Sequence, residues 1–269
     1  MQLKPGDILT NSELANYFKC GTQGGMRKSN QTNSLVLISN HLKSLYDDRW
    51  IDDIFHYTGM GTKGDQSLDF MQNKTLVQSI NSDISIFLFE VFEEKKYTYI
   101  GEVQLTSTPY KEIQPDSNGK DRNVWVFPLK LKNTIVVPID NKIYKSLEEK
   151  KQKQVKSLSL DELKDRATKS RKNVGRRPVI STQYERDPLV SEYTKRKANG
   201  VCQLCNEKAP FLNSKNEPYL ETHHIIWLSK GGEDTIENTV ALCPNCHKKM
   251  HILNLDSDRE YLLKKVNTF

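Results

Sequence analysis

The alternation of apolar and polar residues predicts that the first half of the chain is rich in strands. Residues 34–39 are apolar and partly β-branched between polar neighbours, which is typical of a buried strand. The same reasoning predicts further strands at Ile84–Phe92, Tyr97–Leu105, Val124–Leu131 and Thr134–Ile139. A short helix is expected over Ser12–Lys19, stopped near Gly21. We therefore expect a compact β-rich domain over residues 1–141.

The pattern changes after this domain. Residues 142–185 lack sustained apolar content, so we expect a polar helix followed by a linker that forms the domain junction. Asp187-Pro188 then provides a helix N-cap and first turn, and Gly200 a stop. Strand-like residues 217–227, a short return strand at 240–242 and a helix over Pro244–Ile252 complete a second domain, residues 186–269. The fold class that this pattern predicts is α+β.

The charge of the chain is concentrated in the connecting segment. Residues 142–177 hold 13 Lys and Arg against 5 Asp and Glu, whereas residues 1–141 hold 15 against 17 and residues 178–269 hold 12 against 12. A basic segment favours contact with a phosphate backbone, although a solvated charged linker has the same composition. The sequence shows neither a signal peptide nor an apolar run of about 20 residues, so we expect a soluble, cytoplasmic protein without membrane contact.

Four of the five cysteines form two Cys-x-x-Cys pairs. In a reducing compartment this spacing favours thiolate ligation of a metal over disulfides, and tetrahedral Zn²⁺ is the natural ion for four thiolates. Four thiolates leave no open coordination position, so the ion is expected to be structural. The predicted ligands are Cys202, Cys205, Cys243 and Cys246. The fifth cysteine, Cys20, is expected to be a small buried thiol.

Histidines between and beyond these cysteines provide candidate catalytic groups. His223 and His224 are adjacent, Asn238 follows, and the helix predicted at 244–252 places His247 and His251 on one face. This arrangement resembles the HNH, or ββα-metal, nuclease family. The resemblance implies that His224 is the general base, that His223, His247 and His251 bind a catalytic Mg²⁺ or Mn²⁺, and that Asn238 fixes the loop that orients His224.

Within that family the surrounding residues are most similar to the McrA-like modification-dependent restriction endonucleases, which implies a bacterial protein. The match runs through residues 186–269 and is carried by Arg186-Asp187-Pro188, the segment Gly200 to Cys205, Ala209-Pro210-Phe211, Pro218 to Glu221, His223-His224 and Val240 to His247.

The N-terminal domain resembles a second family, the SET- and RING-associated (SRA) domain. The residues that carry the resemblance are Ser34 to Leu37, Tyr46 with Asp48, Phe55 to Gly59, Gly64 to Leu68 and Asn73 to Leu76. The resemblance implies a twisted barrel that flips a modified cytosine out of DNA. It makes Tyr46 and Tyr57 the rings that stack on the base, Asp48 the reader of its edge, and Thr58 a further pocket residue. The chemistry agrees with these roles. A carboxylate accepts a hydrogen bond from the N4 amino group of cytosine, and aromatic rings stack on the flipped base and offset the stacking that it loses in the duplex.

The two resemblances together imply a modification-dependent endonuclease acting on double-stranded DNA that carries 5-methylcytosine or 5-hydroxymethylcytosine. Because one HNH site cuts one strand, we expect a homodimer. Two alternatives remain open: an HNH endonuclease that reads unmodified DNA, and a non-catalytic modified-DNA-binding protein in which zinc is only structural.

Overall fold

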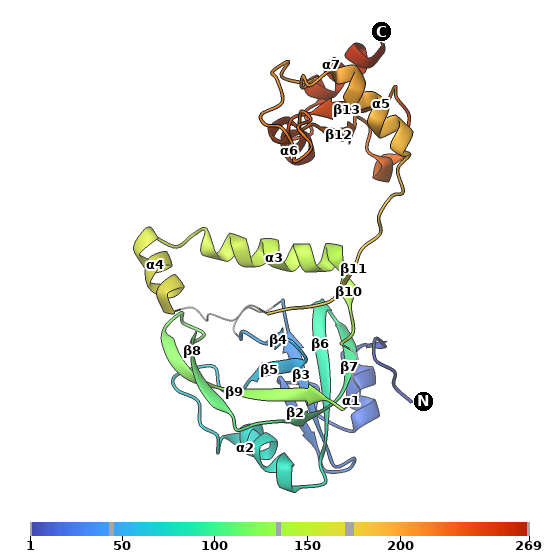
Figure 1. Ribbon diagram of the computed structural model, residues 1–269. Coiled ribbons are helices and arrows are strands. Elements are labelled where there is room, and N and C mark those ends of the chain that lie inside the picture. Colours follow the sequence, from blue (N-terminus) through green and yellow to red (C-terminus); the bar gives the residue numbers. More distant parts are fainter. Residues whose placement is uncertain (1, 43–45, 133–135, 170–174, 268–269) are drawn as a thin grey trace. The chain divides into compact units, whose positions relative to one another are not determined.

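The chain forms two compact units, residues 1–181 and 182–269 (Figure 1). The computed structural model describes residues 2–42, 46–132, 136–169 and 175–267. Within these ranges there is no helix whose length and apolar content would suit a membrane span. One large sheet in the first unit and a helix-rich second unit confirm the predicted α+β class.

A nine-stranded sheet forms the centre of the first unit, in the order β2-β3-β6-β7-β9-β5-β4, with β1 paired to β7 and β8 to β9. β3 and β6 are parallel, and the other pairs are antiparallel. The strands are β1 Ile8–Leu9, β2 Met26–Ser29, β3 Ser34–Asn40, β4 Arg49–Ile51, β5 Ile54–Thr58, β6 Ser85–Glu93, β7 Lys96–Leu105, β8 Tyr110–Pro115 and β9 Asp121–Leu131.

Two apolar clusters lie on this sheet, because its central strands are buried on both faces. β3 is buried from Ser34 to Ser39 without alternation. One cluster packs beneath helix α2, Met71–Gln78, which continues into the short helix η1, Ser79–Asn81. The other packs beneath helix α1, Asn11–Phe18, which begins with a capping box between Thr10 and Glu13.

The sequence predicted β3, β6, β7, β9 and α1, and these elements are confirmed. The strand predicted at 134–139 is wrong for the described residues, because only Ile139 is in a strand; residues 134 and 135 lie outside them. Pro138 has no N–H to donate to a ladder, and Val136 and Val137 instead pack against the core as loop residues. Strands β4, β5 and β8 and helix α2 were not predicted.

The connector contains the predicted polar helix. Helix α3, Asn141–Val155, is capped by Asp140, and helix α4, Leu160–Lys169, follows it. The chain then returns to the first unit, where β11, Val179–Ile180, pairs in parallel with β10, Ile139–Asp140. The residues just before the second unit, which the sequence suggested to be linker, therefore pack on the first.

The second unit is small and helical around one hairpin. It comprises helix α5 Pro188–Ala198, strand β12 Glu221–His224, helix η2 Leu228–Lys230, strand β13 Thr239–Leu242, helix α6 Pro244–Ile252 and helix α7 Asp256–Asn267. Asp187 caps α5 as predicted, accepting a bond from Leu189 N at 2.8 Å. α7 was not predicted; it closes the core with Leu262 and Val266. A core of this size is marginal by itself, and a bound metal ion would stabilise it further.

Candidate functional site

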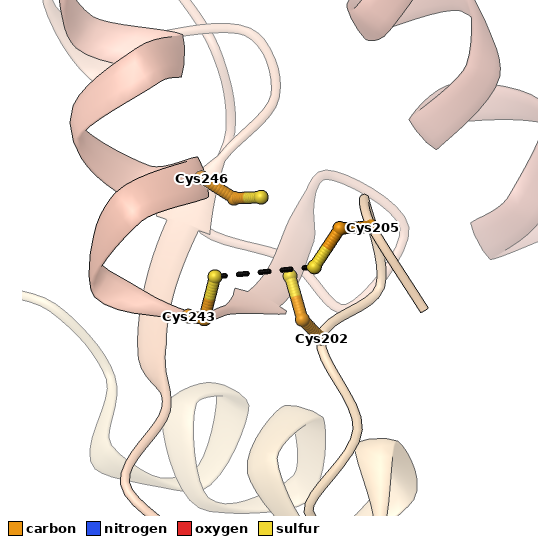
Figure 2. Close-up of side chains that lie close together, drawn as sticks. All are labelled: Cys202, Cys205, Cys243 and Cys246. Atoms are coloured by element: carbon orange, nitrogen blue, oxygen red, sulfur yellow. Dashed lines mark hydrogen bonds between the residues drawn. The ribbon is translucent and has the colours of Figure 1, made fainter. Parts of the chain in front are cut away.

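Four cysteine sulfurs converge in the second unit (Figure 2). Cys202 and Cys205 lie in the loop after α5, and Cys243 and Cys246 lie at the start of α6. All four sulfurs are within 4.8 Å of one another, and those of Cys205 and Cys243 are 4.0 Å apart. Sulfurs at about 2.3 Å from a tetrahedral zinc ion are about 3.8 Å apart. The cluster therefore fits a structural zinc ion.

The ionisation of these thiols supports that interpretation. Burial raises the pKa of Cys202, but N–H groups of Cys205, Cys243 and Leu204 outweigh it and bring the pKa to about 7. Burial and the neighbouring thiols raise the pKa of Cys246. Without an ion the sulfurs thus oppose one another's ionisation. A cation removes this conflict, because thiolates are the form that binds metal.

Three imidazoles form a second cluster. Ligand atoms of His223, His247 and His251 lie within 4.8 Å of one another, and the Nε2 atoms of His247 and His251 are 3.0 Å apart. His223 is buried, and its Nε2 has no hydrogen-bond partner among the residues that the structure describes. Burial and then the charges of the other two histidines lower the pKa of His223 to about 3. A neutral imidazole with a free buried nitrogen is the form that binds a metal ion.

Glu221 orients this cluster, a role that the sequence did not assign. Its carboxylate contacts Nδ1 of His247, and it accepts a bond from the Tyr219 hydroxyl at 2.9 Å. The hydrogen bond from His247 is the largest cause that lowers the pKa of Glu221. Because Nδ1 of His247 is engaged by the carboxylate, Nε2 faces His251 and is available to an ion.

His224 is outside this cluster but close to it, because its charge is among the causes that lower the pKa of His223. The two residues are consecutive in β12, so their side chains leave the strand in different directions. His224 is buried, and its Nε2 lies 2.7 Å from Oδ1 of Asp234. Asp234 also accepts a bond from Asp187 N at 2.6 Å, so one carboxylate ties the start of α5 to His224. Asp234 was not predicted as a site residue, because nothing in its local sequence distinguishes it from solvated acids.

Asn238 holds the loop between the two hairpin strands. Its amide nitrogen donates to the carbonyls of Ile226 and Glu233 at 2.9 and 2.7 Å, and its oxygen accepts from Ile226 N at 2.8 Å. Gly232 allows this close approach, because a Cβ there would lie 2.0 Å from the Ile226 carbonyl oxygen. Asn238 thereby contacts only the backbone of the loop in the described residues.

In the first unit, a cavity of about 390 Å³ lies beside Asp48. Asp48 is buried, accepts a bond from Thr58 N at 2.7 Å, and has its pKa raised by burial. Tyr46 also lines the cavity, with its hydroxyl donating to the Gly61 carbonyl at 3.0 Å. The remaining lining residues, which the sequence did not single out, are Thr22, Gln23, Gly24, Gly25, Arg27, Ile38, Asn40 and Tyr97.

Tyr57 differs in position from Tyr46. Its ring belongs to the apolar core with only 3% of its surface exposed, and its hydroxyl donates to the Gly25 carbonyl at 2.8 Å. The structure thus brings Tyr46 and Asp48 to one cavity, whereas Tyr57 lies beneath Gly25, one of its lining residues. Thr58 does not line the cavity and reaches it only through the hydrogen bond from its N–H to Asp48. Stacking of Tyr57 on a base stays a prediction, and it requires the ring to become accessible.

The comparisons with known proteins match both units. A family model described as the ScoMcrA-like SRA domain matches residues 5–151, and an HNH endonuclease model matches residues 202–252. The type IV methyl-directed restriction enzyme EcoKMcrA of Escherichia coli (strain K12) is 44% identical over 88 residues, which are 31% of this chain. The alignment spans 32% of that relative, so the chain covers about a third of its length.

Two solved structures match this chain at low sequence identity and with low TM-scores. The type IV phosphorothioation-dependent restriction endonuclease ScoMcrA is 18% identical, with 100% of this chain and 63% of that chain covered and a TM-score of 0.41. The modification-dependent TagI restriction endonuclease is 18% identical over 93% of this chain and 78% of its own, with a TM-score of 0.37. Because the first family model covers more than half of the chain, this protein belongs to the ScoMcrA-like SRA-domain family and carries an HNH endonuclease domain C-terminal to that domain.

Proposed function

We propose that this protein is a bacterial cytoplasmic, modification-dependent DNA endonuclease. Its first unit would read a modified cytosine in double-stranded DNA, and its second would hydrolyse a phosphodiester bond nearby. The observation that carries the proposal is the convergence of His223, His247 and His251, with an unpartnered buried nitrogen, within an HNH domain that follows an SRA domain.

His224 and Asp234 are the groups that would remove a proton from the attacking water. We infer that the Nε2–H of His224 donates a hydrogen bond to Asp234 and keeps its proton, which leaves the Nδ1 lone pair to accept a proton from the attacking water. The hydrogen bond from His224 is the largest cause that lowers the pKa of Asp234, so this carboxylate stays ionised and favours the imidazolium that forms. Asn238 would keep the loop, and with it His224, in place.

The imidazole cluster would hold one divalent ion through His223, His247 and His251. When bound, such an ion stabilises charge on the phosphoryl oxygens and the leaving 3′ oxygen. Of the two ions that the sequence analysis names, Mn²⁺ suits three imidazoles better than Mg²⁺, which prefers oxygen ligands. The product would carry a 5′ phosphate.

In the reader, we propose that the cavity beside Asp48 accepts a flipped cytosine. Asp48 would accept a hydrogen bond from the N4 amino group of the cytosine, and Tyr46 would stack on its ring. Tyr57 would form the second face only if its ring moves out of the core. 5-Methylcytosine and 5-hydroxymethylcytosine are the modifications that the family resemblance favours.

A cleavage assay on matched duplexes tests the reader. The duplexes carry cytosine, 5-methylcytosine, 5-hydroxymethylcytosine or its glucosylated form, with a phosphorothioate duplex added because ScoMcrA is described as phosphorothioation-dependent. We expect Mn²⁺-dependent cutting of one or both of the first two modified cytosines, and loss of the preference in Asp48→Asn. Equal cutting of the unmodified duplex would support an HNH enzyme without a modification reader. Binding without cutting would support a non-catalytic protein.

Double-strand cleavage requires a second active site, so we propose that two copies act together on DNA. Gel filtration of the protein with and without a modified duplex tests this. A monomer in both conditions, together with nicked rather than fully cut product, would contradict the dimer but leave the endonuclease proposal intact.

A further inference from the structure

Glu90 is a buried carboxylate whose counter-ion comes from the connector. It lies in β6 with 0% of its side chain exposed and contacts the guanidinium of Arg177, 87 residues later in the chain. His41 Nε2 lies 2.7 Å from the same carboxylate, and Trp50 Nε1 lies 3.5 Å from its second oxygen. A carboxylate buried so completely requires a cation, and Arg177 supplies it from outside the sheet.

Backbone contacts fix the segment around Arg177 as well. Arg176 N donates to the Trp50 carbonyl at 2.9 Å, and Ile139 N donates to the Pro178 carbonyl at 3.3 Å. The Arg177 guanidinium carbon lies 5.0 Å from the centre of the Phe92 ring. With the β10–β11 pair, these contacts pin residues 175–180 to the first unit.

The ion pair and the candidate base reader border one cavity. Arg177, Asp48, His41 and residues of α3 line this second cavity, of about 240 Å³. Asp48 also lines the base cavity, and His41 contacts Glu90. The attachment of the connector therefore lies directly beside the candidate base reader.

This attachment determines how much chain is free before the nuclease domain. Between Ser181 and the start of α5 at Pro188 there are six residues, Thr182 to Asp187. Fully extended they span at most about 20 Å, which is about 6 base pairs of DNA. If the attachment were lost, the free chain would begin after α4 and contain 18 residues, 170–187. It would then span at most about 60 Å, or about 18 base pairs.

We propose that Arg177 and Glu90 are positioning residues that anchor the connector beside the base reader and thereby set the distance between the modified base and the cut. This rests on the proposed endonuclease function. Neither residue touches the reacting phosphate. They act by keeping the tether of the nuclease domain short, so the anchored enzyme cuts within a narrow window.

The test compares wild type, Arg177→Ala and Arg176→Ala on a long duplex with one modified cytosine, with cut positions mapped on both strands. Arg176 is the matched control, because it carries the same charge but contacts Trp50 only through its backbone. We expect Arg177→Ala to widen the spread of cut positions by about threefold, following the ratio of the two tether lengths. We expect Arg176→Ala to cut as wild type does.

A second readout does not depend on activity. Limited proteolysis of the full-length protein with a broad-specificity protease should cut residues 175–181 at least tenfold faster in Arg177→Ala than in Arg176→Ala. If wild type cuts no modified duplex, the proposed function fails, but this proteolysis still tests the anchor. If Arg177→Ala destabilises the first unit, the double variant E90Q/R177Q removes both charges together, and the same widening is expected. An unchanged spread and unchanged proteolysis, or equal effects in Arg176→Ala, would overturn the proposal.

Discussion

The two units differ in the partners of their buried polar groups. In the first unit, Glu90 meets its counter-charge within the chain, from Arg177, and hydrogen-bonds to His41. In the second unit, the four thiols of the cysteine cluster gather around one another, and the buried Nε2 of His223 has no hydrogen-bond partner in the described part of the chain. In the first unit the chain supplies the counter-charge itself, although Nη1 of Arg177 has no hydrogen-bond partner among the described residues, whereas the second unit gathers groups that can bind a metal ion.

This difference shows where each unit obtains its stability. The sheet of the first unit carries two apolar clusters in addition to its internal ion pair. The second unit has one cluster, and Cys202, Cys243 and Cys246 are packed in or against it. Removing metal should therefore act on the second unit, and removing the ion pair on the first.

Metal removal should have the largest effect. Structural zinc contributes an apparent free energy of about 10 kcal/mol or more in small domains, so chelation or Cys205→Ser should unfold residues 182–269 and abolish cleavage. Hydrogen exchange should show lost protection in α5 and α6 with β6 and β7 unchanged. Cys20→Ser, outside the cluster, is the control and should behave as wild type. Full protection of α6 after metal removal would contradict a structural role.

Removal of the proposed general base should come next. We expect His224→Ala to lower the cleavage rate by about 10² to 10⁴-fold, the usual contribution of a positioned acid or base. Affinity for modified DNA should not change, because the reader is in the other unit. Single-turnover cleavage and a binding assay separate the two effects, with His56→Ala as a control histidine. Wild-type cleavage by His224→Ala would remove His224 from the mechanism.

Loss of the ion pair should destabilise only the first unit. Arg177→Ala leaves Glu90 buried without a counter-ion, which typically costs about 3–5 kcal/mol. Burial raises the pKa of Glu90, but Arg177 and His41 outweigh it and bring the pKa to about 2, below the ordinary 4.5. The contribution of the ion pair to the free energy of unfolding is therefore complete above about pH 4.5 and is lost as the pH falls towards 2.

Denaturation monitored between pH 7 and pH 2 checks this window. The stability difference between wild type and Glu90→Gln should shrink as the pH falls through it. A difference that is constant over this range would show that Glu90 does not titrate as the ion pair requires.

The smallest effect should come from replacing Glu221, whose carboxylate contacts Nδ1 of His247. Glu221→Gln keeps the shape of the side chain but weakens its hold on Nδ1 of His247. We expect a loss of about 10–100-fold in affinity for the catalytic ion, without loss of the zinc ion. Titration of Mn²⁺ in the cleavage assay measures this, and rescue by high Mn²⁺ is expected. A lower maximal rate without a change in the Mn²⁺ requirement would contradict it.

The sequence predicted the second unit better than the first. Its metal-binding residues recur at short spacings, and a helix period of 3.6 places His247 and His251 together without knowledge of the fold. Strands β3, β6, β7 and β9 could also be predicted from the sequence, because they are long and apolar. Strands β4 and β8 were not, since they are short or polar and depend on β5 and β9 for pairing.

Local sequence thus determined the α+β class, the cysteine and histidine clusters and the capped helices, because each depends on residues that are close in the chain or on a regular period. Tertiary structure alone decided that Tyr57 faces the core, that His224 meets Asp234 and that Arg177 neutralises Glu90. These contacts join residues from separate elements. A buried charged side chain needs a partner, but the sequence around it does not show which distant residue that partner is.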